Sequence, residues 1–197
     1  ALAEQARQMI HCSNLYWIPR QIELAERLSR ITGLEKWFFC NSGAEANEAA
    51  VKLARRWGVQ NKGPEAYEII TAAGSFHGRT MGALAATGQA KYQDGFGPMV
   101  PGFRYVPFGD IEAVEAAVTP NTCAVMVEPI QGEGGVNVPP GGYLKALRDL
   151  CDRRGLLLII DEVQTGMGRT GRWLACHHED VLPDVVTMAK ALANGVP

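Results

Sequence analysis

The sequence predicts an α/β protein built on a mostly parallel, doubly wound sheet with helices on both faces. Apolar runs alternate with helical patterns along the chain, which is typical of strand–helix units. The runs are apolar throughout, as in strands that are covered on both faces. The predicted strands are Trp37–Cys40, Tyr67–Ala72, Phe103–Val106, Cys123–Val127, Leu156–Ile160 and Val185–Met188, and the predicted helices are Gln21–Ile31, Ala44–Trp57, Ile111–Ala117 and Gly142–Arg153.

The first predicted strand leads into a marked helix start. After "WFFC" comes "NSGAEANEAA", in which Ser42 and Glu45 have the spacing of a capping box and Gly43 allows close approach to the backbone. A helix start offers free N–H groups and a positive dipole end, which suit a phosphate. A well-capped, alanine-rich helix without a ligand is the alternative.

The second and fourth strands end in side chains that suit binding. After "YEIITA", the segment "AGSFHGRT" offers a flat apolar face at Phe76, a titratable ring at His77 and a planar cation at Arg79 that matches a carboxylate. A turn with a core Phe and a surface Arg is the alternative. After "CAVMV", the segment "EPIQGEGG" contains two acids, of which we expect Glu133 to be functional and Glu128 to be structural.

The last two strands end in an acid and an amine. Asp161 follows the apolar run "LLLII", and Lys190 follows "VVTMA". A carboxylate at the end of a buried strand is costly unless a cation meets it, so a buried Asp161–Lys190 ion pair is one interpretation.

The segment "DEVQTGMGRTG" has glycines in the G-x-G-x-x-G spacing of a dinucleotide fingerprint. In that fingerprint the first glycine follows its strand almost at once, and an acid closes the next strand. Here Gly166 comes five positions after Asp161, and Asp184 stands before the next strand, not after it. We therefore reject a nicotinamide-binding site.

An acid, a lysine, an aromatic face, a phosphate site and an arginine together fit pyridoxal phosphate. Its aldehyde needs a lysine amine, and its ring nitrogen needs a carboxylate so that the ring can accept electrons. Its phosphate suits a helix start. An amino-acid substrate then needs an arginine for its carboxylate.

Composition sets further bounds. The 197 residues carry a net charge of -2 and are 47% hydrophobic, which fits one globular domain and gives no sign of a nucleic-acid surface. The pairs Arg55–Arg56 and Arg153–Arg154 are interpreted as solvated helix ends.

The five cysteines are widely spaced, which favours reduced thiols in the cytoplasm over a disulfide framework or a zinc site. No apolar run is long enough to span a membrane, and "HHED" is expected to be surface without a metal.

The motifs "NSGAEANEAA", "SFHGRT", "EPIQGEGG", "DEVQTGMGRTG" and "MAKAL" occur in an order that resembles the class III aminotransferases, which have fold type I among pyridoxal-phosphate enzymes. The segments "SNLYWIP" and "NSGAEANEAAVKLAR" are most similar to the branch that acts on N-acetylornithine. Branches that act on succinylornithine, ornithine or 4-aminobutyrate are the alternatives. This resemblance implies transfer of a terminal amino group to 2-oxoglutarate, giving N-acetylglutamate semialdehyde and glutamate.

The resemblance also implies roles for individual residues. Lys190 would form the Schiff base and move the proton, and Asp161 would keep the pyridine nitrogen protonated. Arg79 would bind the substrate carboxylate, and Glu133 would gate substrate choice by pairing with an arginine of a carboxyl-terminal domain. The remaining cofactor contacts would be Gln164 to the ring hydroxyl, Val163 and Phe76 to the ring faces, and Ser42, Gly43 and Ala44 to the phosphate.

Family enzymes are homodimers with active sites at the interface, so a homodimer is expected. Residues 1–197 are expected to be a partial cofactor-binding large domain, truncated at both ends and lacking the amino-terminal segment and the carboxyl-terminal small domain. Such a piece could be inactive alone. A decarboxylase, an aminomutase or a catalytically silent relative remains the alternative.

Overall fold

The computed structural model describes residues 1–13 and 15–196, so Asn14 of the segment "SNLYWIP" lies outside the described residues. The chain divides into two compact units, residues 1–38 and residues 39 onward, and each is described by itself.

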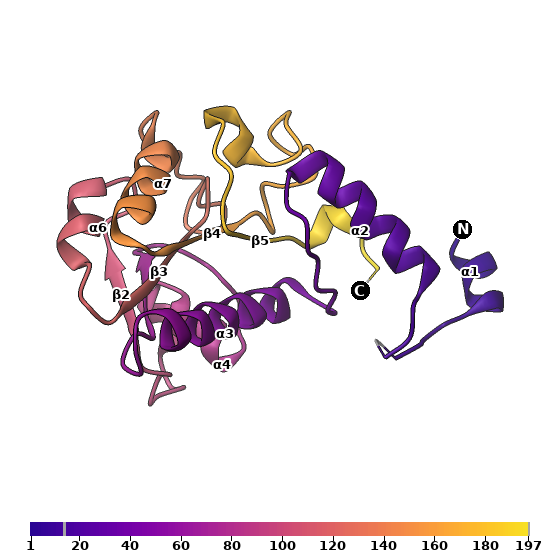
Figure 1. The fold of residues 1–197 in the computed structure, drawn as a ribbon, viewed down its shortest axis with the longest axis horizontal. Coiled ribbons are helices and arrows are strands. Elements are labelled where there is room, and N and C mark those ends of the chain that lie inside the picture. The colour runs from indigo at the N-terminus through magenta and orange to yellow at the C-terminus, as the bar shows by residue number, and fades with distance from the viewer. Residues whose placement is uncertain (14, 197) are drawn as a thin grey trace. The chain divides into compact units, whose positions relative to one another are not determined.

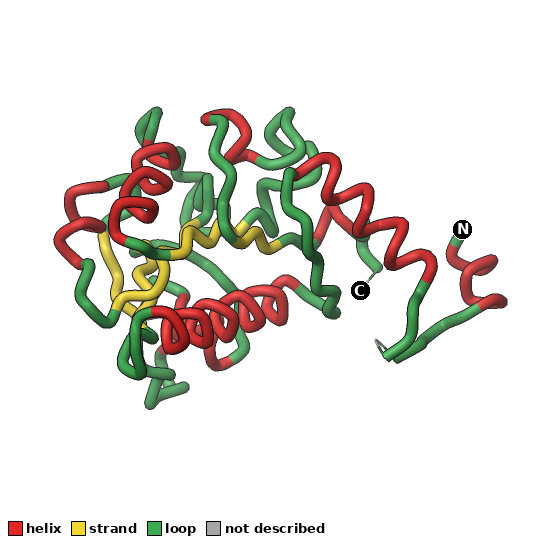
Figure 2. The backbone as a smooth tube through the Cα atoms, viewed as in Figure 1, coloured by secondary structure: helices red, strands yellow, loops and turns green. Residues whose placement is uncertain are grey.

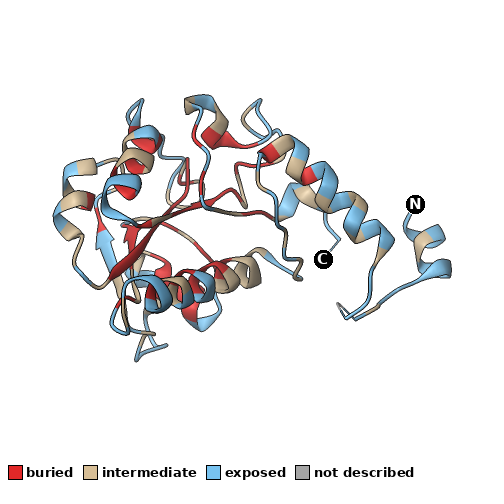
Figure 3. Cartoon of the chain, in the orientation of Figure 1, coloured by how far each residue is buried: buried red, intermediate tan, exposed pale blue. Residues whose placement is uncertain are grey.

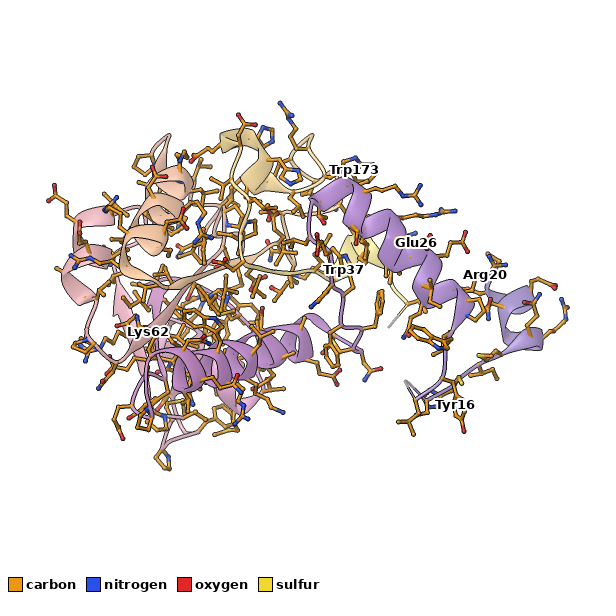
Figure 4. All side chains as sticks on the ribbon, viewed as in Figure 1. Tyr16, Arg20, Glu26, Trp37, Lys62 and Trp173 are labelled. Carbon is orange, nitrogen blue, oxygen red and sulfur yellow. The ribbon has the colours of Figure 1, made fainter. Side chains whose placement is uncertain are left out.

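The first unit contains the helices α1 (Leu2–Gln8) and α2 (Pro19–Thr32). Pro19 stands in the first turn of α2, where its missing N–H is tolerated, and Gly33 ends the helix in the left-handed conformation at φ 82°. Along the exposed face of α2, Arg20, which is labelled in Figure 4, and Arg27 both pair with Glu23. The predicted helix Gln21–Ile31 is therefore confirmed and extends slightly at both ends.

The predicted strand Trp37–Cys40 is wrong. Residues 33–40 have no strand or helix assignment, and the Phe38 side chain is 70% exposed. The indole N–H of Trp37 donates to the Ser29 hydroxyl at 3.0 Å, across the end of α2. An apolar run predicts a strand only if another strand is available to pair with it, and "WFFC" has no such partner among the described residues.

The second unit is built on a five-stranded, fully parallel sheet with strand order β2-β1-β3-β4-β5. Helices α3 and α4 lie on one face of it, and α6 and α7 lie on the other (Figures 1 and 2). This confirms the predicted α/β class. The strands are β1 (Glu68–Ala72), β2 (Phe103–Val106), β3 (Thr122–Val127), β4 (Leu157–Asp161) and β5 (Val185–Thr187). The α-helices are α3 (Gly43–Asn61), α4 (Met81–Ala86), α5 (Ala90–Gln93), α6 (Ile111–Ala117) and α7 (Tyr143–Arg154). Two 3₁₀ helices, η1 (Ala175–Glu179) and η2 (Lys190–Leu192), complete the unit.

The core lies between the sheet and its helices, and every residue of β3 is buried (Figure 3). Small residues let α3 approach the sheet: a Cβ added at Gly58 would lie 2.0 Å from the Ala66 carbonyl oxygen and 2.5 Å from the Cys123 Cβ. At the far end of α3, the Lys62 amine donates to the Gly155 carbonyl just beyond α7, at 3.2 Å (Figure 4). This bond joins the two helical layers at the amino-terminal edge of the sheet.

Arg55 does not lie at a solvated helix end. It sits within α3, half-buried, with its guanidinium 5.8 Å from the Tyr67 ring centre and 5.2 Å from that of Phe103. Burial lowers the pKa of Arg55. The pair Arg153–Arg154 does end α7, and Arg154 contacts Glu115 at 2.9 Å. None of the helices in the described part of the chain combines the length and hydropathy of a membrane-spanning segment.

The strand order reverses at β1, because β2 lies on one side of it and β3 on the other. In open parallel sheets, ligands bind beyond the carboxyl ends of the strands at such a switch point. The loops that follow β1 and β3 contain "AGSFHGRT" and "EPIQGEGG". The fold therefore brings together two segments that are far apart in the sequence.

Candidate active site

The start of α3 meets the carboxyl ends of β4 and β5. A Cβ added at Gly43 would lie 2.9 Å from Val163 Cγ1 and 3.3 Å from the Ala189 Cβ. Val163 follows Asp161 by two residues, and Ala189 directly precedes Lys190. The absence of a side chain at Gly43 is therefore what allows these three segments to converge.

The cap of α3 differs in one respect from the predicted capping box. The Glu45 N–H donates to the Ser42 hydroxyl at 3.2 Å, as predicted. The Glu45 carboxylate, however, accepts from the N–H of Asn41 at 2.7 Å and not from Ser42. Among the described residues, the N–H groups of Gly43 and Ala44 have no protein partner. Two free donors at the start of a 19-residue helix suit an anion.

Asp161 is 3% exposed and is the acceptor of a buried hydrogen-bond network. Its Oδ2 atom accepts from Asn47 Nδ2 and from His77 Nδ1, both at 2.8 Å. Its Oδ1 atom accepts the Val163 N–H at 3.0 Å. Three donors around one carboxylate are the pattern of an ionised acid, and Oδ1 retains a lone pair for one more donor.

His77, and not Lys190, is the side chain that pairs with Asp161. Burial alone would lower the pKa of His77, but the hydrogen bond and the negative charge of Asp161, together with Glu128, outweigh burial and raise it. No Asp161–Lys190 ion pair occurs among the described residues, so that interpretation is wrong. Within the same residues, His77 Nε2 and Asn47 Oδ1 have no hydrogen-bond partner.

Glu128 lies at the base of the loop after β3 and is 5% exposed. Its carboxylate accepts the Phe76 N–H at 3.0 Å and also the N–H of Gly132, so it joins the loops after β1 and β3. Burial, reinforced by the charge of Asp161, raises the pKa of Glu128 to about 7. We call the four side chains of Asn47, His77, Glu128 and Asp161 the buried cluster.

A second polar group is more open to solvent. The Glu133 carboxylate accepts from the Tyr92 hydroxyl and from Gln89 Nε2, the latter at 2.6 Å, and lies 3.6 Å from the Lys91 amine. These contacts, that of Tyr92 first, lower the pKa of Glu133. The Arg79 guanidinium lies 5.7 Å from the Tyr92 ring centre and has no ion-pair partner among the described residues. We call Arg79, Gln89, Lys91, Tyr92 and Glu133 the rim cluster.

Phe76 lies between the two clusters. Its N–H belongs to the buried cluster through Glu128, whereas its ring stands edge-on to Tyr92 with centres 5.3 Å apart. The Arg79 guanidinium lies 5.8 Å from the Phe76 ring centre. The predicted site residues of this loop are therefore in mutual contact.

Lys190 lies at the mouth of an open cavity of about 460 Å³. It is exposed, and its backbone occupies the left-handed region at φ 46°, which is uncommon for a residue other than glycine. Gln164 and Gly132 line the same cavity and touch each other, since a Cβ at Gly132 would overlap the Gln164 amide. The cavity is also lined by Ile130, Val136, Thr165, Arg169, Thr170 and Ala191.

The glycines of "GMGRTG" form a closed loop, in which the Met167 N–H donates to the Trp173 carbonyl at 2.7 Å. No α-helix begins within residues 162–179, where a dinucleotide fingerprint requires one. Within the described ranges 1–13 and 15–196, no group of His, Cys, Asp and Glu side chains is arranged to hold a metal ion.

The contributors to the site that carry no assigned role in the sequence motifs are Asn47, Gln89, Lys91 and Tyr92. Asn47 occurs within "NSGAEANEAA" as a polar residue on an otherwise alanine-rich helix, which is a weak signal of a buried contact. Tyr92 lies outside all five motifs, on the short helix α5, and no local pattern marks it.

Comparisons with known proteins agree with this arrangement. The sequence model of the class-III aminotransferases matches residues 1–197. The acetylornithine aminotransferase of Methanocaldococcus jannaschii is 56% identical over 197 residues, which are all of this chain and 50% of the relative. The chain thus spans about half the length of the curated relatives that it matches.

Solved structures show the same fold. An ornithine aminotransferase from Toxoplasma gondii, with partial occupancy of PLP at its active site, has a TM-score of 0.95 at 38% identity. The match covers 100% of this chain and 47% of the chain of that structure. The N-acetylornithine aminotransferase from Stenotrophomonas maltophilia has a TM-score of 0.83 at 43% identity, covering 100% and 49%. The backbone alone therefore does not separate the two donor classes.

Proposed function

The chain belongs to the class III aminotransferase family, and on that premise we propose that it carries the cofactor-binding large domain of a pyridoxal-phosphate-dependent transaminase. The proposed reaction moves the terminal amino group of N-acetylornithine to 2-oxoglutarate, giving N-acetylglutamate semialdehyde and glutamate. Identities above 50% to acetylornithine aminotransferases from several organisms support this donor. We further propose a homodimer, as expected from the family.

The described residues fit pyridoxal phosphate. The free N–H groups of Gly43 and Ala44, next to Ser42, suit its phosphate. The spare lone pair on Asp161 Oδ1 suits a protonated ring nitrogen. Val163 contacts both of these regions, through Gly43 on one side and through its N–H to Asp161 on the other. Val163 therefore lies between the phosphate site and the ring-nitrogen site, where its side chain would pack on the ring.

When bound, the cofactor supplies a ring that accepts the electron pair released at the amine-bearing carbon of the substrate. Asp161 would keep the ring nitrogen protonated, and the hydrogen bonds from Asn47 and His77 fix the orientation of the Asp161 carboxylate. Lys190 would hold the cofactor aldehyde through its amine, and the freed amine would move the proton at the substrate carbon. Its exposed position at the cavity suits both tasks.

The remaining predicted residues serve binding. Phe76 and Val163 would pack on the cofactor ring, and Gln164, which lines the same cavity as Lys190, would donate to the ring hydroxyl. Arg79 takes the α-carboxylate of the amino acid through a planar pair of N–H donors. Glu133, on the same rim, adjusts the fit to donors of different charge.

One observation carries this proposal. Asp161 is a buried carboxylate that already pairs with His77, and the same edge of the sheet carries two unused helix N–H groups and an exposed lysine. Free donors and a free amine at the edge of the sheet that carries a buried, paired acid are the pattern of a functional site.

Reduction with borohydride in the presence of the cofactor tests the proposal. In the full-length protein, we expect the cofactor mass on the Lys190 peptide and no label in the Lys190→Ala variant. Lys52, which is exposed on α3, provides the matched control: Lys52→Ala should label as the wild type does. A label on any other lysine, or none at all, contradicts the assignment of Lys190.

A panel of donors tests the substrate. Semialdehyde and glutamate formation should be fastest with N-acetylornithine, and slower with succinylornithine, ornithine and 4-aminobutyrate. A higher kcat/KM for any of these three would reassign the donor within the family. Release of carbon dioxide in place of glutamate formation would show that the reaction is a decarboxylation and not an amino-group transfer.

A further inference from the structure

Tyr92 touches three of the residues that form the predicted substrate side of the site. Its hydroxyl donates to the Glu133 carboxylate, its ring centre lies 5.7 Å from the Arg79 guanidinium, and its ring packs against Phe76 in a T-shaped arrangement. A single side chain thus connects a candidate gate, a candidate carboxylate binder and a candidate ring-stacking residue.

Glu133 and Arg79 have opposite charges and share Tyr92 as a neighbour, yet they do not form an ion pair in the described part of the chain. The carboxylate is engaged on both oxygens: Oε1 by the Tyr92 hydroxyl and the Lys91 amine, and Oε2 by Gln89. Arg79 makes contacts to two aromatic rings, and these leave its N–H donors free.

We propose that Tyr92 is a specificity-determining positioning residue that holds Glu133 on the Gln89–Lys91 side and thereby keeps Arg79 available for the substrate carboxylate. This inference rests on the proposed function, because it assumes that Arg79 binds the α-carboxylate. Tyr92 acts only through Arg79 and Glu133 and makes no contact with the reacting atoms.

The physical reason is competition between two carboxylates for one guanidinium. Without the hydroxyl of Tyr92, Glu133 loses a hydrogen bond and gains freedom to turn toward Arg79, which contacts the same tyrosine and has no acid partner among the described residues. An internal pair that is formed most of the time lowers the apparent affinity for an external carboxylate in proportion to the fraction of free Arg79. A loss of roughly 3- to 10-fold corresponds to an internal pair formed about 70–90% of the time.

The same competition defines which ligands are affected. Ligands with a carboxylate in the position of the amino-acid α-carboxylate depend on free Arg79 and should bind less well. A simple alkylamine without a carboxylate does not use Arg79 and should be unaffected. Tyr92 would therefore favour amino acids over plain amines as donors.

Glutarate is a suitable probe because it has carboxylates but neither an amine nor a keto group, so it binds without turnover. Its affinity for the full-length holoenzyme would be measured by calorimetry for the wild type, Tyr92→Phe, Glu133→Gln and the double variant. We expect Tyr92→Phe to weaken glutarate roughly 3- to 10-fold. In the Glu133→Gln background, which removes the competing charge, Tyr92→Phe should change the affinity less than about twofold.

Tyr105→Phe is the matched control, since the Tyr105 hydroxyl bonds the Ala85 carbonyl and Gln93 and has no contact with Glu133. It should leave glutarate binding unchanged. In steady-state assays, Tyr92→Phe should raise KM for N-acetylornithine and leave kcat within about twofold, which a general loss of structure would not do.

The proposal is overturned if Tyr92→Phe binds glutarate as the wild type does, or if it loses the same affinity with Glu133→Gln present. It is also overturned if Arg79→Gln leaves glutarate binding unchanged, because Arg79 is then not the carboxylate binder. Absence of amine transfer by the wild type, with the glutarate pattern intact, would instead contradict the proposed reaction and leave the role of Tyr92 supported.

Discussion

The buried cluster and the rim cluster both include residues of the loops after β1 and β3 and contain similar chemical groups, but they differ in their access to water. Asp161 and Glu128 are 3% and 5% exposed, and His77 is 2% exposed. In the rim cluster, the Glu133 side chain is 27% exposed, the Lys91 side chain is 63% exposed and Arg79 is an exposed residue. Phe76 separates the two, with its backbone in one and its ring in the other.

This difference in exposure explains how one site can have a rigid interior and a rim that exchanges its binding partners. Inside, a charge that loses its partner cannot be compensated by water, so each group is fixed by the others. On the rim, water and substrate can replace any partner at small cost. The fixed charges are therefore suited to holding a cofactor ring in one protonation state, and the exposed charges are suited to binding and releasing substrates.

Removing the acid at the centre of the buried cluster should have the largest effect. Asp161→Ala leaves His77 and Asn47 without their shared acceptor, and breaking a buried pair in this way costs about 3–5 kcal/mol of the free energy of unfolding. Urea unfolding at pH 7 measures this loss. The control is Glu115→Ala, which removes an exposed partner of Arg154 and should cost less than about 1 kcal/mol. Equal losses in the two variants would show that the buried cluster is in fact hydrated.

A smaller effect is expected at Glu128, and it depends on pH. The pKa of Glu128 is about 7 in the folded protein and near 4.5 when exposed, so the unfolded chain loses this proton first as the pH rises. The Glu128 carboxyl therefore lowers stability progressively between pH 4.5 and 7, by up to about 3 kcal/mol. The raised pKa of His77 acts in the same direction, because its stabilisation is complete below the pKa of the unfolded residue and is lost as the pH rises through the folded pKa.

Glu128→Gln removes the carboxyl contribution and leaves the part of the His77 contribution that comes from Asp161. We expect the variant to unfold at higher urea than the wild type at pH 8 and to show a shallower fall in stability between pH 5 and 7. Glu133→Gln is the matched control from the rim. The pKa of Glu133 is lowered, so its stabilisation is present above its usual pKa and is lost only as the pH falls below it. A flattened pH profile from Glu133→Gln, with none from Glu128→Gln, would reverse the assignment of the two clusters.

The fold could be predicted from the sequence where a segment's own pattern decides its structure. The bounds of β2 and α6 agree with the prediction, because a short strand or helix flanked by Gly, Pro and Asp has clear limits. "WFFC" was mispredicted because its strand formation depends on a partner elsewhere in the chain. Arg55 was mispredicted for the same reason, since the aromatic rings that cover it come from distant segments.

The site divides in the same way. Residues next to a strand end, such as Asp161 and Arg79, could be proposed because a parallel sheet gathers its strand ends at one edge. The side chains that hold Asp161 and Arg79 in place could not be proposed from the sequence. Asn47 is 114 residues from Asp161, and Tyr92 is 41 residues from Glu133, and neither lies in a recognisable local pattern with its partner. The choice of His77 over Lys190 as the partner of Asp161 likewise depends on packing that only the folded chain defines.

The smallest effect on stability should come from the rim, at Arg79. Its contacts are two exposed cation–π interactions, so Arg79→Gln should change the free energy of unfolding by no more than about 1 kcal/mol. The same variant should raise KM for carboxylate-bearing donors by about 10- to 100-fold, since a charge-assisted hydrogen bond to a ligand contributes about 1.5–3 kcal/mol. Steady-state kinetics and urea unfolding on one preparation give both numbers.

Arg172→Gln, at an exposed arginine outside both clusters, provides the comparison and should change neither quantity. Arg79→Gln would contradict the distinction between the clusters if it destabilised the protein as much as Asp161→Ala, because the rim would then be a structural element. A large rise in KM without loss of stability would establish the opposite: at this edge of the sheet, the charge that is least needed for folding is the one most needed for recognition.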